Sequence, residues 1–319
     1  MMKTLNKTGL ASLVAALTTG TALAADGVTV YGKLNVTAQK SDYYTKNDSG
    51  EITNTDETKI QSNASRLGVK GAFDLGNSLE AFYTIEYQVN TDSSSSDNFT
   101  ARSQFIGLKG NFGSVAVGRN DTVTKKSQGK IDQFNDLNGD IKNLFKGDNR
   151  LAQTVTYLSP SFSNFKFGAT YTAEGDNKQG EDDTGISLAA MYGDAKLKKS
   201  KIFASVAYDA EVAGYDILRA TVQGKIGALK LGGMVQQQES LKAGSESKTG
   251  YLVSAAYTID KVTLKSQFQD MEDKGDSWSV GADYKLGKPT KVFAFYSTRS
   301  DEALSKDNDY VGVGIEHKF

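Results

Sequence analysis

Apolar and polar side chains alternate along most of this chain with a period of two residues. In LEAFYTIEYQV (79–89), FKFGATY (165–171) and WSVGADYKL (278–286), every second residue is apolar and most residues between them are polar or small. This pattern is typical of a β-sheet with one face in an apolar environment and the other in water. The mean hydropathy is only −0.43, so we expect the chain to bury its apolar residues on one face of each strand.

The alternating segments predict about sixteen strands. We expect them near residues 27–38, 62–73, 78–90, 98–110, 112–119, 150–159, 164–173, 184–193, 201–209, 214–226, 228–239, 249–259, 261–270, 276–287, 290–299 and 309–319.

Short and long connections between these segments also alternate. The short ones are 74–77, 110–111, 227–228, Asp260 and 287–289, and the long polar ones are 41–59, 91–97, 174–183, 239–247 and 297–309. Short turns at one end and long loops at the other are typical of an outer-membrane barrel. A propeller would show a blade repeat of roughly 40–45 residues, and the sequence has none. The predicted fold is therefore an all-β, transmembrane, antiparallel β-barrel.

The first residues have the pattern of a secretory signal peptide. Lys3 and Lys7 precede a short apolar stretch, and Ala22-Leu23-Ala24 forms an A-x-A cleavage site. A membrane anchor would need roughly 18 or more apolar residues. We therefore expect residues 1–24 to be removed on export, which leaves a single barrel domain from residue 25 to residue 319.

Composition excludes several classes of function. The chain has 37 Lys plus Arg, 38 Asp plus Glu, no cysteine and one histidine. Because basic and acidic residues are nearly equal in number, the chain shows no sign of the basic surface that nucleic-acid binding requires. With one histidine and no cysteine, His-pair and thiolate metal sites are impossible. DLNGD (136–140) does not fit a calcium loop, because Phe145 stands where the twelfth-position Glu should be. A hydrolase is equally disfavoured, since no G-x-S-x-G occurs and His317 lies near the end of the chain. We expect no cofactor, no metal site and no catalysis.

The chain ends on an amphipathic strand that stops at Phe319. Every strand edge must be paired in a bilayer, so we expect this last strand to pair with the first. Aromatic residues near the segment ends could form girdles at the two membrane surfaces, although Tyr and Phe also favour strands in general. These residues are Tyr31, Tyr87, Tyr157, Tyr171, Tyr192, Tyr208, Tyr251, Tyr257 and Phe319.

Several motifs resemble those of the Gram-negative general porins. They are VTVYGKLN (28–35), SRLGVKGAFDLGNSLEAFYTIEY (65–87), ARSQFIGLKGNFGSVAVGRND (101–121), QTVTYLSPSFSNFKFGATY (153–171) and the terminal VGIEHKF. The resemblance implies a homotrimer of sixteen-stranded channels in the outer membrane, in contact with its lipids and lipopolysaccharide. It also implies passive diffusion of small hydrophilic solutes, and a terminal Phe319 that the barrel-assembly machinery reads as a signal.

The long segment 120–149 lies where the family's third loop folds into the barrel and narrows it. A structureless connection of this length needs a function of its own. Asp132, Asp136 and Asp140 recur every four residues, which would place them on one side of a short helix. The resemblance implies that Asp132 and Asp136 are acids of a pore constriction.

The opposite wall of the constriction is predicted to be basic. Alternation places Lys33, Arg66 and Arg102 on the polar face, with Gln104 beside Arg102 and opposite Phe105. The resemblance implies that Lys33, Arg66, Arg102 and Arg150 form a basic wall facing the loop acids. Such a pair of walls creates a transverse field across the pore. Arg119 matches a family position that we interpret as a loop or subunit-contact anchor.

Some features depart from the family or leave alternatives open. Residues 135–140 read NDLNGD instead of the family's Pro-Glu-Phe-Gly-Gly element, so the aperture is not determined. Lys125, Lys126 and Lys130 share the loop with the acids, which leaves the charge preference open. A carbohydrate-specific channel would need an aromatic path, for which Phe82, Phe293 and Phe295 are the candidates. A structural or adhesive barrel with a plugged lumen is the other alternative.

Overall fold

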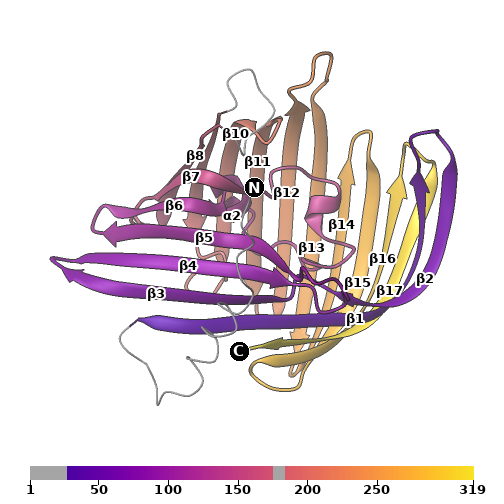
Figure 1. Cartoon of the computed structure of the whole chain (residues 1–319), viewed down its shortest axis with the longest axis horizontal. Helices are drawn as coiled ribbons and strands as arrows, with labels where there is room; N and C mark the ends of the chain where they lie inside the picture. Colours follow the sequence, from indigo (N-terminus) through magenta and orange to yellow (C-terminus); the bar gives the residue numbers. More distant parts are fainter. Residues whose placement is uncertain (1–26, 175–183) are drawn as a thin grey trace.

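The computed structural model describes residues 27–174 and 184–319 and shows a closed antiparallel β-barrel (Figure 1). The predicted signal peptide lies outside the described residues. Within the described part, no helix is long and apolar enough to cross a membrane. The strands are β1 (Val28–Lys46), β2 (Ile52–Ser62), β3 (Arg66–Gly76), β4 (Leu79–Val89), β5 (Phe99–Gly110), β6 (Gly113–Asp121), β7 (Arg150–Leu158), β8 (Phe165–Thr172), β9 (Gly185–Gly193), β10 (Ile202–Val212), β11 (Tyr215–Ile226), β12 (Leu229–Ser240), β13 (Lys248–Ile259), β14 (Val262–Met271), β15 (Gly275–Lys285), β16 (Thr290–Asp301) and β17 (Lys306–Lys318).

The strands β2 and β3 together occupy one position in the wall. Strand β3 pairs with β1 along Val28–Lys33, and β2 pairs with the rest of β1, from Val36 to Lys46. Between them the chain bends at Ala64, whose φ is 51°. The wall therefore has the sixteen positions that the alternation predicts.

The barrel closes where β1 pairs with β17, with Lys33 opposite Lys318 and Asp42 opposite Asp309. Backbone hydrogen bonds between Gly32 and Phe319 complete the seam, at 3.0 and 3.2 Å. A Cβ atom on Gly32 would lie 2.3 Å from Cζ of Phe319. Glycine is therefore required where the terminal ring crosses the first strand, and the predicted pairing of the last strand with the first is confirmed.

The prediction of a polar loop at residues 41–59 is wrong. Strands β1 and β2 continue there as a paired hairpin, and the turn between them spans only residues 47–51. The reason lies in side chains such as Tyr43, Thr45 and Ile52, which favour strands despite the polar character of the segment. The connections predicted at 239–247 and 297–309 are likewise shortened by longer strands. Most of the connection predicted at 174–183 lies outside the described residues.

The two faces of the wall differ in chemistry. On the outer face, apolar side chains such as Val253, Ile315 and Val313 are about half exposed, as expected for contact with lipid. On the inner face of β1, polar side chains such as Gln39 are buried. Tyr31 does not belong to the predicted outer aromatics, because its hydroxyl donates to Glu86 on the inner face.

A charge on the outer face should destabilise the barrel. Val313 lies near the middle of β17 and is 60% exposed on the outer face. We expect Val313→Arg to lower the free energy of unfolding by about 2–4 kcal/mol, since arginine is poorly solvated by hydrocarbon. Urea unfolding in lipid vesicles measures this. Thr53→Arg in the β1–β2 hairpin is the control, and an equal loss in both variants would contradict the placement of Val313 against lipid.

Candidate functional site

Residues 122–149 connect β6 to β7 and lie against inner-face residues of the barrel. This β6–β7 segment contains only helix α2 (Val123–Ser127) and a single 3-10 turn, η1 (Ile141–Asn143). The helix expected across the three aspartates is absent here, so that prediction is wrong. Asp136 has a φ of 68°, and Asp140 instead accepts hydrogen bonds from the backbone N–H groups of Asp136 and Lys142. Aspartate side chains that bind nearby N–H groups favour turns over helix.

Strand side chains hold the backbone of the β6–β7 segment. Gln267 donates to the carbonyl of Gly139 at 2.8 Å and accepts from the N–H of Gln133 at 2.8 Å. Arg219 donates to the carbonyl of Lys146 at 2.7 Å. Similar bonds join Ser205 to the carbonyl of Ser127, Gln223 to the N–H of Lys130, Ser254 to the carbonyl of Ile131 and Lys274 to the carbonyl of Leu144. These bonds satisfy backbone groups that regular secondary structure would otherwise pair.

Val123 of α2 packs against Ala189 of β9 and Ala207 of β10, and two larger apolar clusters fix the later part of the segment to the wall. One contains Ile131, Ile141, Leu144 and Phe145 of the segment with Met234, Leu252 and Met271 of the strands. The other contains Phe134 and Leu137 with Phe293, Phe295 and Tyr310. Fully buried apolar side chains each contribute about 1.5–3 kcal/mol, so the part of the segment from Ile131 to Phe145 is attached along the β12–β17 side of the barrel. It does not hang free.

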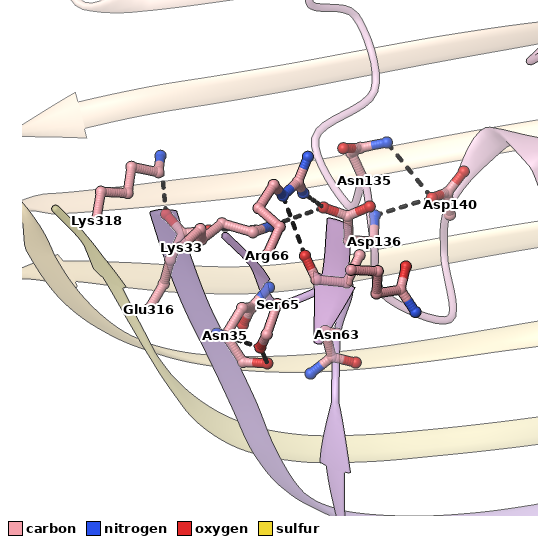
Figure 2. Close-up of polar contacts among 12 residues, drawn as sticks. Lys33, Asn35, Asn63, Ser65, Arg66, Asn135, Asp136, Asp140, Glu316 and Lys318 are labelled. Carbon is pink, nitrogen blue, oxygen red and sulfur yellow. Dashed lines mark hydrogen bonds and ion pairs between the residues drawn. The ribbon is translucent and has the colours of Figure 1, made fainter. Parts of the chain in front are cut away.

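The tip of the segment reaches β1 and β3, and β1 is the direct neighbour of β17 in the wall. Figure 2 shows the side chains of Lys33 of β1 and Arg66 of β3 both directed at Asp136, whose Oδ2 lies 2.7 Å from a nitrogen of each. Lys33 also lies 3.8 Å from Glu316. One carboxylate thus forms ion pairs with two cations. The sequence predicted acids and bases facing each other across the pore, whereas Asp136 touches the basic wall directly.

Arg102 and Arg150 lie farther along the same wall. Arg102 donates a hydrogen bond to Glu86 at 2.6 Å, and Arg150 forms an ion pair with Asp121, with 2.8 Å between nitrogen and oxygen. The predicted pairing of Arg102 with Gln104 on one face is wrong, because a bulge interrupts the β4–β5 register between them. Gln104 is paired with Ile85, which is exposed on the outer face.

Arg119 lies opposite Gln104 in the β5–β6 register and therefore has the outer-face parity. It is half-buried and does not line either of the lumen cavities described below. This position is compatible with the predicted loop or subunit-contact anchor, which stays a prediction.

The two predicted loop acids have different environments. Burial raises the pKa of Asp136, but the charges of Lys33 and Arg66 outweigh that effect and hold the pKa below its ordinary value. Asp132 accepts hydrogen bonds from the N–H groups of Phe134 and Ile141, one on each oxygen. Burial and the nearby charge of Asp140 raise the pKa of Asp132. Asp132 thus holds the segment's backbone as well as facing the lumen.

Two cavities in the lumen meet at a small set of residues. The first, of about 760 Å³, opens toward Phe319 and Lys318, and the second, of about 560 Å³, lies along Arg102 and Arg150. The residues common to both linings are Arg66, Lys130, Asp132, Asn135 and Asp136. The junction is therefore formed by Arg66 of the wall and by residues of the β6–β7 segment.

Sequence reasoning missed the residues that hold the segment in place. Gln236 and Gln238 lie two apart on β12, Gln267 and Gln269 lie two apart on β14, and all four are buried. Arg219 is 1% exposed, with bonds to Gln236 and to the segment's backbone. The sequence signal that could have revealed them is the repetition of glutamine at alternate inward positions. Rows of long amide side chains indicate hydrogen bonds to a backbone segment inside the barrel.

Comparison with known proteins identifies the family. A model described as Gram-negative porin matches residues 10–304. The chain belongs to this family. The major outer membrane protein P.IB of Neisseria meningitidis serogroup B is 28% identical over 325 residues, covering 92% of this chain and 94% of the relative.

Solved structures give the same fold. An anion-selective porin from Comamonas acidovorans superposes with a TM-score of 0.69 at 20% identity, covering 92% of this chain and 99% of that one. The trimer form of in-vitro folded OmpT, an outer membrane protein of Vibrio cholerae, gives 0.64 at 16% identity, covering 92% and 100%. The porin described here is a passive channel for small hydrophilic solutes and ions in the Gram-negative outer membrane.

The ion pairs of Asp136 should govern how firmly the segment's tip is attached. We expect Asp136→Asn to lower the free energy of local opening by about 1–3 kcal/mol, because Lys33 and Arg66 lose their shared carboxylate. Native-state hydrogen exchange at the N–H of Leu137 measures this opening. Asp97→Asn, in an external loop, is the matched control and should leave it unchanged. Equal protection in Asp136→Asn and the unaltered protein would contradict the role of the ion pairs.

The same contact predicts a pH dependence. The pKa of Asp136 is lowered from 3.8 in the folded barrel, so its stabilising effect is complete above about pH 4 and is lost as the pH falls through the folded value. The hydrogen-exchange protection factor of the Leu137 N–H, which is corrected for the pH dependence of intrinsic exchange, should therefore decrease below pH 4 in the unaltered protein. Asp136→Asn lacks this titration and should show a flatter profile. Identical profiles in the two proteins would exclude Asp136 as the titrating group.

Proposed function

We propose that this porin passes small anions in preference to cations. The observation that carries the proposal is the basic excess of the two lumen cavities. The cavity near Phe319 is lined by seven basic and five acidic side chains, and the cavity along Arg102 by eight basic and five acidic side chains. A lumen lined mainly by one sign of charge concentrates ions of the opposite sign.

The position of Asp136 supports the same conclusion. Because this carboxylate binds Lys33 and Arg66 directly, its negative charge does not face an entering ion as an isolated group. Lys126 and Lys130 of the β6–β7 segment line the second cavity together with Arg102 and face the same water-filled space. In the proposed arrangement, Lys33, Arg66, Arg102 and Arg150 form the basic wall of the constriction, Asp132 and Asp136 are its loop acids, and residues 120–149 limit the aperture.

Two other functions fit the geometry less well. A carbohydrate-specific channel needs exposed aromatic rings, but Phe293 and Phe295 are packed under Phe134 and Leu137. A plugged adhesive barrel would fill its lumen, whereas two cavities of several hundred cubic ångströms meet at the junction. We also propose that the protein is not an enzyme, since His317, the only histidine, stacks beside Phe319 at the barrel rim.

The proposed partners follow from the family. The protein is proposed to be exported by its signal peptide, residues 1–24, and assembled by the barrel-assembly machinery through Phe319. It is proposed to lie among outer-membrane lipids and lipopolysaccharide as a homotrimer. The trimer form of a Vibrio cholerae structure with the same fold supports the last point.

Removing basic side chains from the wall should shift the ion preference toward cations. We expect the double variant Arg66→Gln/Arg102→Gln to lower the anion-to-cation permeability ratio about two- to fivefold, corresponding to roughly 0.5–1 kcal/mol of Coulomb energy in a wet lumen. The reversal potential of single channels under a KCl gradient measures this ratio. Lys46→Gln/Lys242→Gln removes two exposed charges outside the lumen and is the matched control. A cation preference in the unaltered protein would overturn the proposal.

The trimer has a separate test. We expect native mass spectrometry of the detergent-purified porin to give three copies of the mature chain, with a mass that fits cleavage after Ala24. Single-channel records should then show closures in three equal steps at high voltage. A monomer that retains full conductance would contradict the trimer without affecting the fold.

A further inference from the structure

A third cavity, the lysine alcove, lies beside the junction of the two lumen cavities. Its volume is about 290 Å³, at the lower end of the range of about 300–1,000 Å³ for small-molecule pockets. It lies between the β6–β7 segment at Lys130 and the turn that joins β9 to β10, residues 194–201. That turn is at the same end of the barrel as Phe319, which is the periplasmic end by the rule of short turns.

The charge of the alcove distinguishes it from the two other lumen cavities. Its lining includes Lys130, Lys196, Lys198 and Lys230 and contains no carboxylate. Among the described residues, none of these four lysine side chains forms an ion pair with an acidic group. Lys130 also lines both of the larger cavities, so an ion at the junction is in direct reach of the alcove.

The alcove is held in shape by bonds that do not involve the ammonium groups. Asp194 accepts hydrogen bonds from the backbone N–H groups of Lys196, Lys198 and Lys199, which folds the turn. Gln223 binds the turn through the carbonyl of Ala195 and the β6–β7 segment through the N–H of Lys130.

The rest of the alcove's lining is uncharged, and part of it is buried. Leu197 is 8% exposed and Ile131 is 1% exposed, and both line the cavity. The hydroxyl of Ser254 is directed to the carbonyl of Ile131. The side-chain donors of Gln133, Gln223 and Ser254 are therefore already paired, and the lysine ammonium groups are the side-chain donors that remain for a ligand.

We propose that the lysine alcove is a binding site for small multivalent oxyanions, at which such ions pause beside the constriction. Several ammonium groups around one small cavity favour an ion that carries two or more negative charges over a chloride ion, because a multivalent ion can contact several of them at once. The site deepens the proposed anion preference and rests on it. The proposal gives the 194–201 turn a role in binding anions, in addition to joining β9 to β10. Passive diffusion through the lumen does not require such a role.

Inorganic pyrophosphate is the probe for this site. In single-channel recordings at constant ionic strength, we expect it to reduce the KCl current with a saturating concentration dependence. Lys196→Gln/Lys198→Gln should raise the half-blocking concentration about tenfold, as expected for the loss of two charge-assisted contacts in a wet cavity. The β-sheet circular dichroism spectrum of the variant in detergent should match that of the unaltered protein, which shows that the variant has folded.

The matched control lies in the same turn. Lys199→Gln/Lys201→Gln removes the same charge from side chains that do not line the alcove, and it should change the half-blocking concentration less than twofold. A linear effect of pyrophosphate, or an equal weakening in both double variants, would overturn the site. The reversal potential in KCl alone keeps the two proposals apart: an anion preference without saturable block overturns only the alcove, and a cation preference overturns the proposed charge selectivity.

Discussion

The pairing of β1 with β17 is the constraint on which the rest of this structure depends. A strand edge left open in hydrocarbon would expose backbone groups at a cost of several kcal/mol each, so the first and last strands must meet. The register from Lys33–Lys318 to Asp42–Asp309 does this, and Phe319 completes it across Gly32. Closure in turn fixes which side of every strand faces lipid and which faces the enclosed space.

The polar face that closure creates has a structural task as well as a transport task. Its glutamines, serines and Arg219 provide hydrogen-bond partners for a segment with very little secondary structure of its own. Apolar inward residues such as Phe293 and Leu252 add packing beneath the same segment. The segment thereby follows the wall past β12–β17 to the neighbouring strands β1 and β3, where Asp136 meets Lys33 and Arg66. Its position is set by the wall more than by its own sequence.

The charges of the lumen follow from this attachment. Because Asp136 is held by two cations, and Arg102 and Arg150 each pair with a single acid, the remaining lysines dominate the open surface. The turn at 194–201 adds Lys196 and Lys198 from the end of the barrel where Phe319 lies. Neither the number of unpaired lysines nor their grouping is visible from net charge, since the whole chain is close to neutral.

The amino-acid sequence by itself determined most strand positions, the inward parity of Lys33 and Arg66, and the meeting of the two chain ends. It could do so because the alternation of apolar and polar residues is a local pattern that can be read directly from the sequence. It failed where the local rule is broken: at the bulge that places Gln104 on the outer face, in the hairpin at 41–59 and at the aspartates of 132–140, which cap turns instead of forming a helix. Only the tertiary structure decided that Asp136 binds the basic wall, that Arg219 and the glutamines hold the segment, and that four lysines share one alcove. These contacts join residues far apart in the chain, and their geometry depends on barrel closure and on the path of the segment, which no local pattern specifies.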